Sequence, residues 1–226
     1  FAIAMMLNLE FEGSKNKRCS LYYDNYTPIR TYILNSDLKN NAIYYLKAYD
    51  TTKENKVKMA DGRELNYDVL IVATGAKIAP EETEGMKGSE WQKSVFDFYT
   101  FEGSLALRNK LRDWQGGKLV VHITEMPIKC PVAPLEFAFL ADSFFKHKHM
   151  RDKVEITYVT PLSGAFTKPK ATEALEHLLH DKNINIESDF AIEHVDNEKK
   201  QIVDYGGREI HFDILVTVPT NKGDAV

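Results

Sequence analysis

Cys130 stands in a segment with several features that favour thiol chemistry. Lys129 precedes it, and residues 135–145, which we predict to be a helix, begin five positions later. A neighbouring cation and a helix N-terminus both favour the thiolate, the nucleophilic form of cysteine. Glu136 falls in the first turn of that helix and is a candidate proton acceptor or donor. The alternative is a structural cysteine beside an ordinary helix-terminal glutamate, and at this position we favour the chemical interpretation.

The same segment occupies the place of a phosphate-binding loop. The apolar strand predicted at 118–123 is followed by residues 124–134, which contain three prolines and no glycine. A pyrophosphate needs close backbone approach and free N–H groups at a helix start, and prolines do not provide them. The strand predicted at 154–159 is followed by Thr160, not by an acid that could bind a ribose. We therefore predict a dinucleotide-type architecture that does not bind NAD.

A second candidate site is the corner Ala73-Thr74-Gly75. The strand predicted at 67–73 is uninterrupted in its apolarity, which is typical of a parallel strand buried on both faces. Open α/β sheets bind ligands at the carboxyl ends of their strands, so we expect Ala73, Thr74 and Gly75 to contact FAD. Asp24 follows a strand predicted at 19–23. It is a candidate to bind the adenosine ribose, although a surface turn aspartate is about as well supported.

The elements that must position these residues alternate between helices and strands. Helices are predicted at 1–9, 97–114, 135–145 and 172–180, and strands at 19–23, 43–46, 56–59, 67–73, 118–123, 154–159, 184–187, 201–203, 209–211 and 213–218. Residues 25–41 are polar and poorly periodic. Turns at 61–62 and 206–207 indicate small β hairpin layers. The alternation predicts an α/β fold with parallel sheets.

An internal repeat indicates two related units. Residues 61–75 read Asp-Gly-Arg-Glu-Leu-Asn-Tyr-Asp-Val-Leu-Ile-Val-Ala-Thr-Gly, and residues 206–219 read Gly-Gly-Arg-Glu-Ile-His-Phe-Asp-Ile-Leu-Val-Thr-Val-Pro. Each copy is a turn followed by a buried strand. We therefore predict two Rossmann-like units of the FAD/NAD(P)-binding type. Residues 1–80 form a partial FAD-binding domain, and residues 81–226 form a second dinucleotide-type domain.

Composition limits the class of protein. The 226 residues are 43% hydrophobic and 27% charged, and the net charge of −4 gives no indication of a nucleic-acid-binding surface. The two cysteines, Cys19 and Cys130, are too few for a disulfide scaffold, so a reducing cytoplasmic location is the default. No apolar run reaches the ~20 residues that span a bilayer. Both ends fall next to apolar elements, so we expect an incomplete chain. We predict no metal site.

The segment Glu125-Met-Pro-Ile-Lys-Cys-Pro-Val-Ala-Pro-Leu-Glu-Phe137 resembles the redox-cysteine segment of the sulfide:quinone oxidoreductase family. That family belongs to the FAD-dependent pyridine nucleotide-disulfide oxidoreductase superfamily. The resemblance runs from about residue 67 to the end and includes the motifs at 81–87, 96–100 and 217–221. It implies that Cys130 is the first of two redox cysteines and that Glu136 is the acid/base. It also implies that FAD carries electrons from sulfide to quinone.

The chain departs from the family pattern at several positions. The glycine loop expected before Phe1 and the second redox cysteine are absent, and Cys19 is a poor substitute. Some members tether FAD through a cysteine near the position of Phe96, so we expect no covalent attachment there. The resemblance implies peripheral contact with the inner face of the cell membrane. A homo-oligomer is a further possibility. The alternatives are an NAD(P)H-dependent flavoprotein reductase, such as a type II NADH dehydrogenase, and a non-catalytic fragment.

Overall fold

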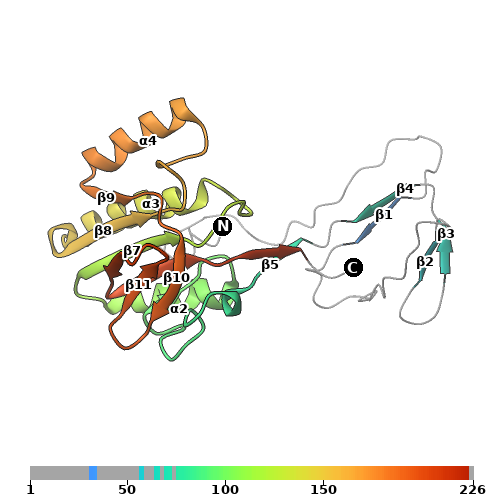
Figure 1. The fold of residues 1–226 in the computed structure, drawn as a ribbon, viewed down its shortest axis with the longest axis horizontal. Helices are drawn as coiled ribbons and strands as arrows, with labels where there is room; N and C mark the ends of the chain where they lie inside the picture. The colour runs from blue at the N-terminus through green and yellow to red at the C-terminus, as the bar shows by residue number, and fades with distance from the viewer. Residues whose placement is uncertain (1–30, 35–55, 59–63, 67–68, 73–74, 224–226) are drawn as a thin grey trace. The chain divides into compact units, whose positions relative to one another are not determined.

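The computed structural model describes residues 31–34, 56–58, 64–66, 69–72 and 75–223 (Figure 1). Contacts between residues divide the chain into two units. One comprises residues 1–13 and 78–221, and the other comprises residues 14–77 and 222–226. The helix predicted at 1–9 and the strands predicted at 19–23 and 43–46 lie outside the described residues.

The unit that contains residues 14–77 has two pairs of short strands. β1 (Thr31–Leu34) pairs in parallel with β4 (Val69–Val72), and the register runs from Thr31 opposite Val69 to Leu34 opposite Val72. β2 (Lys56–Lys58) pairs antiparallel with β3 (Glu64–Asn66). β4 falls inside the strand predicted at 67–73. β1 lies within residues 25–41, for which the sequence predicted no strand. A strand of four residues is too short to show a clear period in the sequence.

The larger unit is built on a five-stranded sheet in which every neighbouring pair is parallel. In spatial order the strands are β6 (Val95–Phe96), β13 (Ile214–Val218), β7 (Gly117–Ile123), β8 (Val154–Val159) and β9 (Ile184–Glu187). All five residues of β13 are buried, as are the last five of β7. The predicted α/β fold with a parallel sheet is confirmed. The existence of two equivalent Rossmann units remains a prediction.

Helices connect the parallel strands of this sheet. They are α2 (Phe101–Asp113), α3 (Ala133–His147) and α4 (Pro169–Asp181), with short 3-10 turns η1 (Pro80–Glu82) and η2 (Arg151–Lys153). α2 starts later than the predicted residue 97 because the preceding side chains cap it. Asp97 Oδ1 accepts the N–H of Thr100 at 2.7 Å, and Thr100 Oγ1 accepts the N–H of Gly103 at 2.9 Å.

The two faces of the parallel sheet bury different elements. Leu119, Val121 and Ile123 of β7 belong to a core cluster that includes the apolar residues of α2 and α3. Val120 belongs to a second cluster that includes Val195 and other residues of an antiparallel sheet. That sheet contains β10 (Ile192–Asp196), β11 (Gln201–Asp204) and β12 (Glu209–His211). Alternation along β7 therefore sends successive side chains to opposite layers.

Two further features complete the described structure. β5 (Ala76–Ile78) and β14 (Asn221–Gly223) form a separate two-stranded sheet. No helix in the described part of the chain has the length and apolarity needed to cross a membrane.

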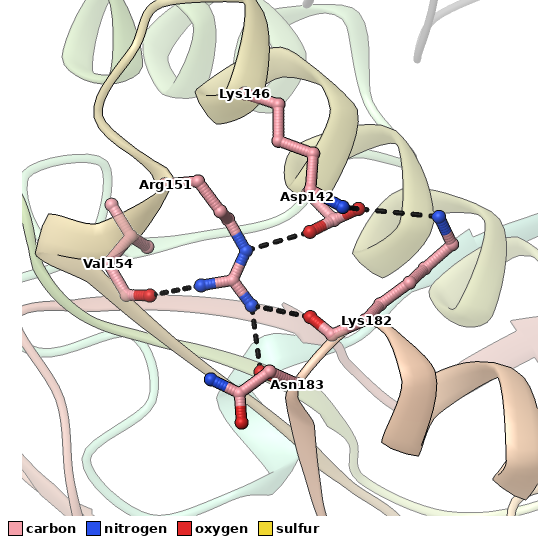
Figure 2. Close-up of polar contacts among 6 residues, drawn as sticks. All are labelled: Asp142, Lys146, Arg151, Val154, Lys182 and Asn183. Atoms are coloured by element: carbon pink, nitrogen blue, oxygen red, sulfur yellow. Dashed lines mark hydrogen bonds and ion pairs between the residues drawn. The ribbon is translucent and has the colours of Figure 1, made fainter.

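A buried carboxylate ties α3 to the elements that follow it (Figure 2). The side chain of Asp142 is 1% exposed. It accepts hydrogen bonds from Lys146 Nζ at 2.9 Å, Arg151 Nε at 2.7 Å and Lys182 Nζ at 3.4 Å. The other nitrogens of the Arg151 guanidinium donate to the backbone carbonyls of Val154, Lys182 and Asn183. These bonds fix the end of α3 against the starts of β8 and β9.

Candidate active site

Cys130 lies in the loop between β7 and α3. The side chain is half-buried, carries a free thiol and packs at the margin of the core cluster that contains α3. Its carbonyl oxygen accepts two hydrogen bonds, one from the N–H of Ala133 at 3.1 Å and one from the hydroxyl of Tyr99 at 3.2 Å. The backbone of the cysteine is therefore fixed while its thiol stays partly accessible.

Two side chains from distant parts of the sequence hold this loop. Tyr99 binds the carbonyl of Cys130, and Asn221 Oδ1 accepts the N–H of Lys129 at 3.0 Å. Asn221 is itself held, because its Nδ2 donates to the Pro219 carbonyl at 2.8 Å. Burial raises the pKa of Tyr99 to about 12, so the phenol remains protonated and can donate at neutral pH. Neither Tyr99 nor Asn221 was predicted from the sequence, although both lie in motifs, 96–100 and 217–221, that carry the family resemblance.

The structure places three of the predicted site residues, Lys129, Cys130 and Glu136, at one loop–helix junction. Lys129 is exposed, and its N–H is the group that Asn221 binds. Glu136 is also exposed, in the first turn of α3, and its N–H donates to the Val132 carbonyl at 3.0 Å. Their roles beside Cys130 remain predictions.

The N-terminus of α3 offers few groups to a phosphate. The N–H of Ala133, the first helical residue, already donates to Cys130, and Pro134 has no N–H. Anion sites at helix starts depend on several free N–H groups that point at the ligand. Only Leu135 remains among the first three helical positions. This geometry supports the interpretation of residues 124–134 as a loop that has replaced a phosphate cradle.

The larger unit contains a cleft of about 690 Å³. Part of its lining comes from the loop that also contains Cys130. It is lined by residues that follow the carboxyl ends of three parallel strands: 124–126 after β7, 161–162 after β8 and Thr220 after β13. Residues 82–83, 191–193 and 205 complete the lining. Cys130 is not among the lining residues. The cleft is therefore formed by residues from six separate segments, which no local sequence pattern brings together.

Two polar residues lie at the end of β7, His122 within the strand and Thr124 directly after it. His122 is completely buried, and its Nδ1 is 2.9 Å from Thr217 Oγ1 on β13. Burial lowers the pKa of His122 to about 3, so the ring is neutral. His122 Nε2 and Thr124 Oγ1 are both buried and have no hydrogen-bond partner among the described residues. Thr124 also lines the cleft.

The predicted flavin-binding corner is only partly described. Asp24, Ala73 and Thr74, as well as Cys19, lie outside the described residues. Gly75 is exposed and has a φ of 80°, a conformation that glycine adopts more readily than other residues. Phe96, which stands near the position of the family's tethering cysteine, is 1% exposed and belongs to the core of the larger unit.

Comparison with known proteins confirms the predicted resemblance. No family model matches the chain. The mitochondrial sulfide:quinone oxidoreductase of Dictyostelium discoideum is 22% identical over 171 residues, which are 74% of this chain and 38% of that protein. The sulfide-quinone reductase of Aquifex aeolicus is 26% identical over 180 residues, 76% of this chain and 40% of that protein.

A solved structure shows the same fold. The crystal structure of the sulfide:quinone oxidoreductase from Aquifex aeolicus superposes with a TM-score of 0.64 at 23% identity. The match covers 80% of this chain and 42% of that one. The chain thus matches only about two fifths of the length of its relatives.

Proposed function

We propose that this chain is the cysteine-bearing part of an FAD-dependent oxidoreductase that oxidises sulfide and passes the electrons to quinone. One observation carries the proposal. Cys130, a free and partly accessible thiol, lies in the turn after β7, where a nicotinamide-binding unit would hold a pyrophosphate. The similarity to proteins named for sulfide and quinone, reported above, supports that chemistry over other thiol chemistry.

The proposed role of Cys130 is to receive sulfide sulfur. In the oxidised protein, Cys130 forms a disulfide with the second cysteine that the resemblance implies. Hydrosulfide attacks one sulfur of this bond, the S–S bond breaks, the other cysteine leaves as a thiolate, and a persulfide forms. Lys129 favours the thiolate form of Cys130, and Glu136 accepts or donates the proton that the exchange requires.

FAD is the proposed electron acceptor for this chemistry. The residues that would hold it are Asp24 at the adenosine ribose and Ala73, Thr74 and Gly75 at the end of β4. When bound, FAD takes up two electrons and can release them to a quinone. We propose that the protein meets quinone by peripheral contact with the membrane. Absence of stoichiometric FAD from the purified complete protein would instead favour a non-catalytic role.

The competing function is reduction of the flavin by NAD(P)H. Two observations weigh against it: the start of α3 has few free N–H groups, and the cleft beyond β7 is lined by Glu82, Glu125 and Glu193. Carboxylates there would repel the phosphates of a dinucleotide.

Steady-state turnover tests the proposed function. Under anaerobic conditions, the complete protein should reduce a soluble quinone analogue with sulfide and fail to do so with NADH. Turnover with NADH alone would assign the protein to the NAD(P)H-dependent reductases instead. Cys130→Ala should remove the sulfide-dependent rate, whereas Cys19→Ala should preserve it.

A further inference from the structure

Two side-chain hydrogen bonds anchor the backbone on both sides of Cys130. The N–H of Lys129 donates to Asn221 Oδ1 at 3.0 Å, and the carbonyl oxygen of Cys130 accepts the hydroxyl of Tyr99 at 3.2 Å. The residue after the cysteine is Pro131, so the peptide group between them has no N–H and is held through its carbonyl. The peptide groups before Lys129 and after Cys130 are therefore both fixed.

These anchors leave the thiol little freedom. Each residue has two soft backbone dihedrals, and those of Lys129 and Cys130 lie between the anchored peptide groups. The sulfur then moves mainly by rotation about χ1, which prefers staggered positions. A disulfide usually requires the two Cα atoms to lie about 4.4–6.8 Å apart, and reacting atoms must come within about 3–3.5 Å of each other. The path of the loop thus decides where the Cys130 sulfur can react.

Tyr99 is presented by a segment that is itself fixed on both sides. Before it, the ring of Phe98 stacks on Phe137 of α3 with the ring centroids 5.3 Å apart, and the Phe98 carbonyl accepts Ser104 Oγ at 3.1 Å. After it, Thr100 caps the start of α2. α3 is the helix that begins where the cysteine loop ends. The donor hydroxyl and the loop that it binds are therefore held against the same helix.

Asn221 is oriented by a bond of its own. Its Nδ2 donates to the Pro219 carbonyl at 2.8 Å, which turns Oδ1 toward the N–H of Lys129. The hydrogen bonds that Tyr99 and Asn221 make to the loop both end on backbone atoms. They therefore set the path of the chain and leave the side chains of the loop available for chemistry.

We propose that Tyr99 and Asn221 are positioning residues for the sulfur exchange at Cys130, an inference that rests on the proposed function. When hydrosulfide attacks the disulfide, one new S–S bond forms, the original S–S bond breaks, and the second cysteine leaves as a thiolate. Tyr99 and Asn221 hold the Cys130 backbone so that the sulfurs align for this attack, and they transfer neither a proton nor an electron. Misplacement by about 1 Å can slow a reaction about a hundredfold.

Anaerobic stopped-flow with sulfide tests the proposal in the complete protein. Tyr99→Phe keeps the ring and removes only the hydroxyl, and it should lower the limiting rate constant of flavin reduction about tenfold, or about a hundredfold when combined with Asn221→Ala. The half-saturating sulfide concentration and the amplitude should not change. A loss of stability alone would lower the amplitude, which reports the folded fraction, and leave the rate constant unchanged. Mass spectrometry of quenched samples should show the Cys130 persulfide forming more slowly by the same factor.

Tyr158→Phe is the matched control. The buried Tyr158 hydroxyl donates to the Ala165 carbonyl at 3.4 Å, so this variant loses a similar bond elsewhere in the same core cluster. It should keep the rate constant of the unmodified protein. Equal slowing in Tyr158→Phe, or an unchanged rate constant in Tyr99→Phe, would overturn the positioning role and leave the proposed function standing. Absence of sulfide-driven bleaching in the unmodified protein would refute the proposed function, and the positioning role with it.

Discussion

The hydroxyl of Tyr99 donates to the carbonyl oxygen of Cys130 at 3.2 Å, across 31 residues of sequence. This bond connects the segment between β6 and α2 to the loop that follows β7. Asn221 binds the adjacent N–H of Lys129 from the segment after β13. Because β6, β13 and β7 are neighbours in the parallel sheet, the sheet order itself brings both side chains to the cysteine loop.

Tyr99→Phe should loosen this loop. Loss of one hydrogen bond should lower the free energy of unfolding by about 1 kcal/mol. Iodoacetamide should then modify the partly buried Cys130 faster, by at most about fivefold, since one kcal/mol corresponds to such a factor. The rates are measured in a Cys19→Ser background. Tyr205→Phe, an exposed tyrosine outside the loop, is the control. An unchanged alkylation rate in Tyr99→Phe would show that the bond does not hold the loop.

The Asp142 cluster should contribute stability at neutral pH. Burial acts to raise the pKa of Asp142, but hydrogen bonds from Lys146 and Arg151 outweigh it and hold the pKa below its usual range. Asp142→Asn should therefore lower the free energy of unfolding by about 3 kcal/mol, near the lower limit for breaking a buried pair, because Lys146 and Lys182 still reach water.

The pH dependence of this difference follows from the sign of the shift. A carboxyl with a depressed folded-state pKa stabilises the protein above its unfolded pKa of about 3.9, and this stability is lost as the pH falls through the folded value. Urea unfolding should show the gap between the unmodified protein and Asp142→Asn narrowing below about pH 4. The exposed Asp113→Asn should show no comparable gap. A gap that stays constant down to pH 2.5, about 1.4 units below the unfolded pKa, would exclude this role for Asp142.

Much of the larger unit was predictable because its elements have strong local signals. β8 and β9 have the predicted bounds, since each is rich in β-branched residues and follows a charged or polar segment. α3 extends two residues beyond the prediction at each end, because the first turn of a helix tolerates Pro134. β6 and β10 were not predicted. β6 has only two residues and pairs with β13, which is distant in sequence. β10 pairs with β11 in a register that shifts between Ile192 and His194.

His122 should remain neutral throughout the physiological range. Burial lowers its pKa to about 3, against about 6.5 in an unfolded chain. The unfolded chain therefore takes up a proton first as the pH falls. Between these two pKa values, the contribution of His122 lowers the free energy of unfolding by about 1.4 kcal/mol for each unit by which the pH falls. NMR should show no titration of the His122 ring between pH 8 and 5, and normal titration in urea. A midpoint above pH 5 in the folded protein would contradict its burial as a neutral ring.

Glu136→Gln should slow sulfide oxidation without displacing FAD. The substitution preserves the size of the side chain and removes only its capacity to exchange a proton. Turnover should fall by about a hundredfold, and the pH profile should lose the limb that reports this group. Glu102→Gln removes the corresponding first-turn acid of α2 and should leave both unchanged. An unaltered pH profile in Glu136→Gln would show that Glu136 does not exchange the proton and acts only as an acid at the helix N-terminus.

The candidate site was only partly predictable. Cys130, Lys129 and Glu136 are close in sequence, so the loop–helix pattern was sufficient to select them. Tyr99 and Asn221 reach the loop only through the order of the strands, and the carboxylates of the cleft come from segments far apart in the chain. Their convergence depends on tertiary structure, which local periodicity does not encode.

We propose that sulfide electrons enter the protein through Cys130. Anaerobic stopped-flow measurement of flavin absorbance after mixing with sulfide tests it most directly, in the complete protein and in Cys130→Ser, with bound FAD measured in both. We expect rapid bleaching in the unmodified protein and no sulfide-driven bleaching in Cys130→Ser at the same FAD content, because a serine hydroxyl cannot form the disulfide or the persulfide. Bleaching of Cys130→Ser at the unmodified rate would show that sulfide electrons do not enter through Cys130.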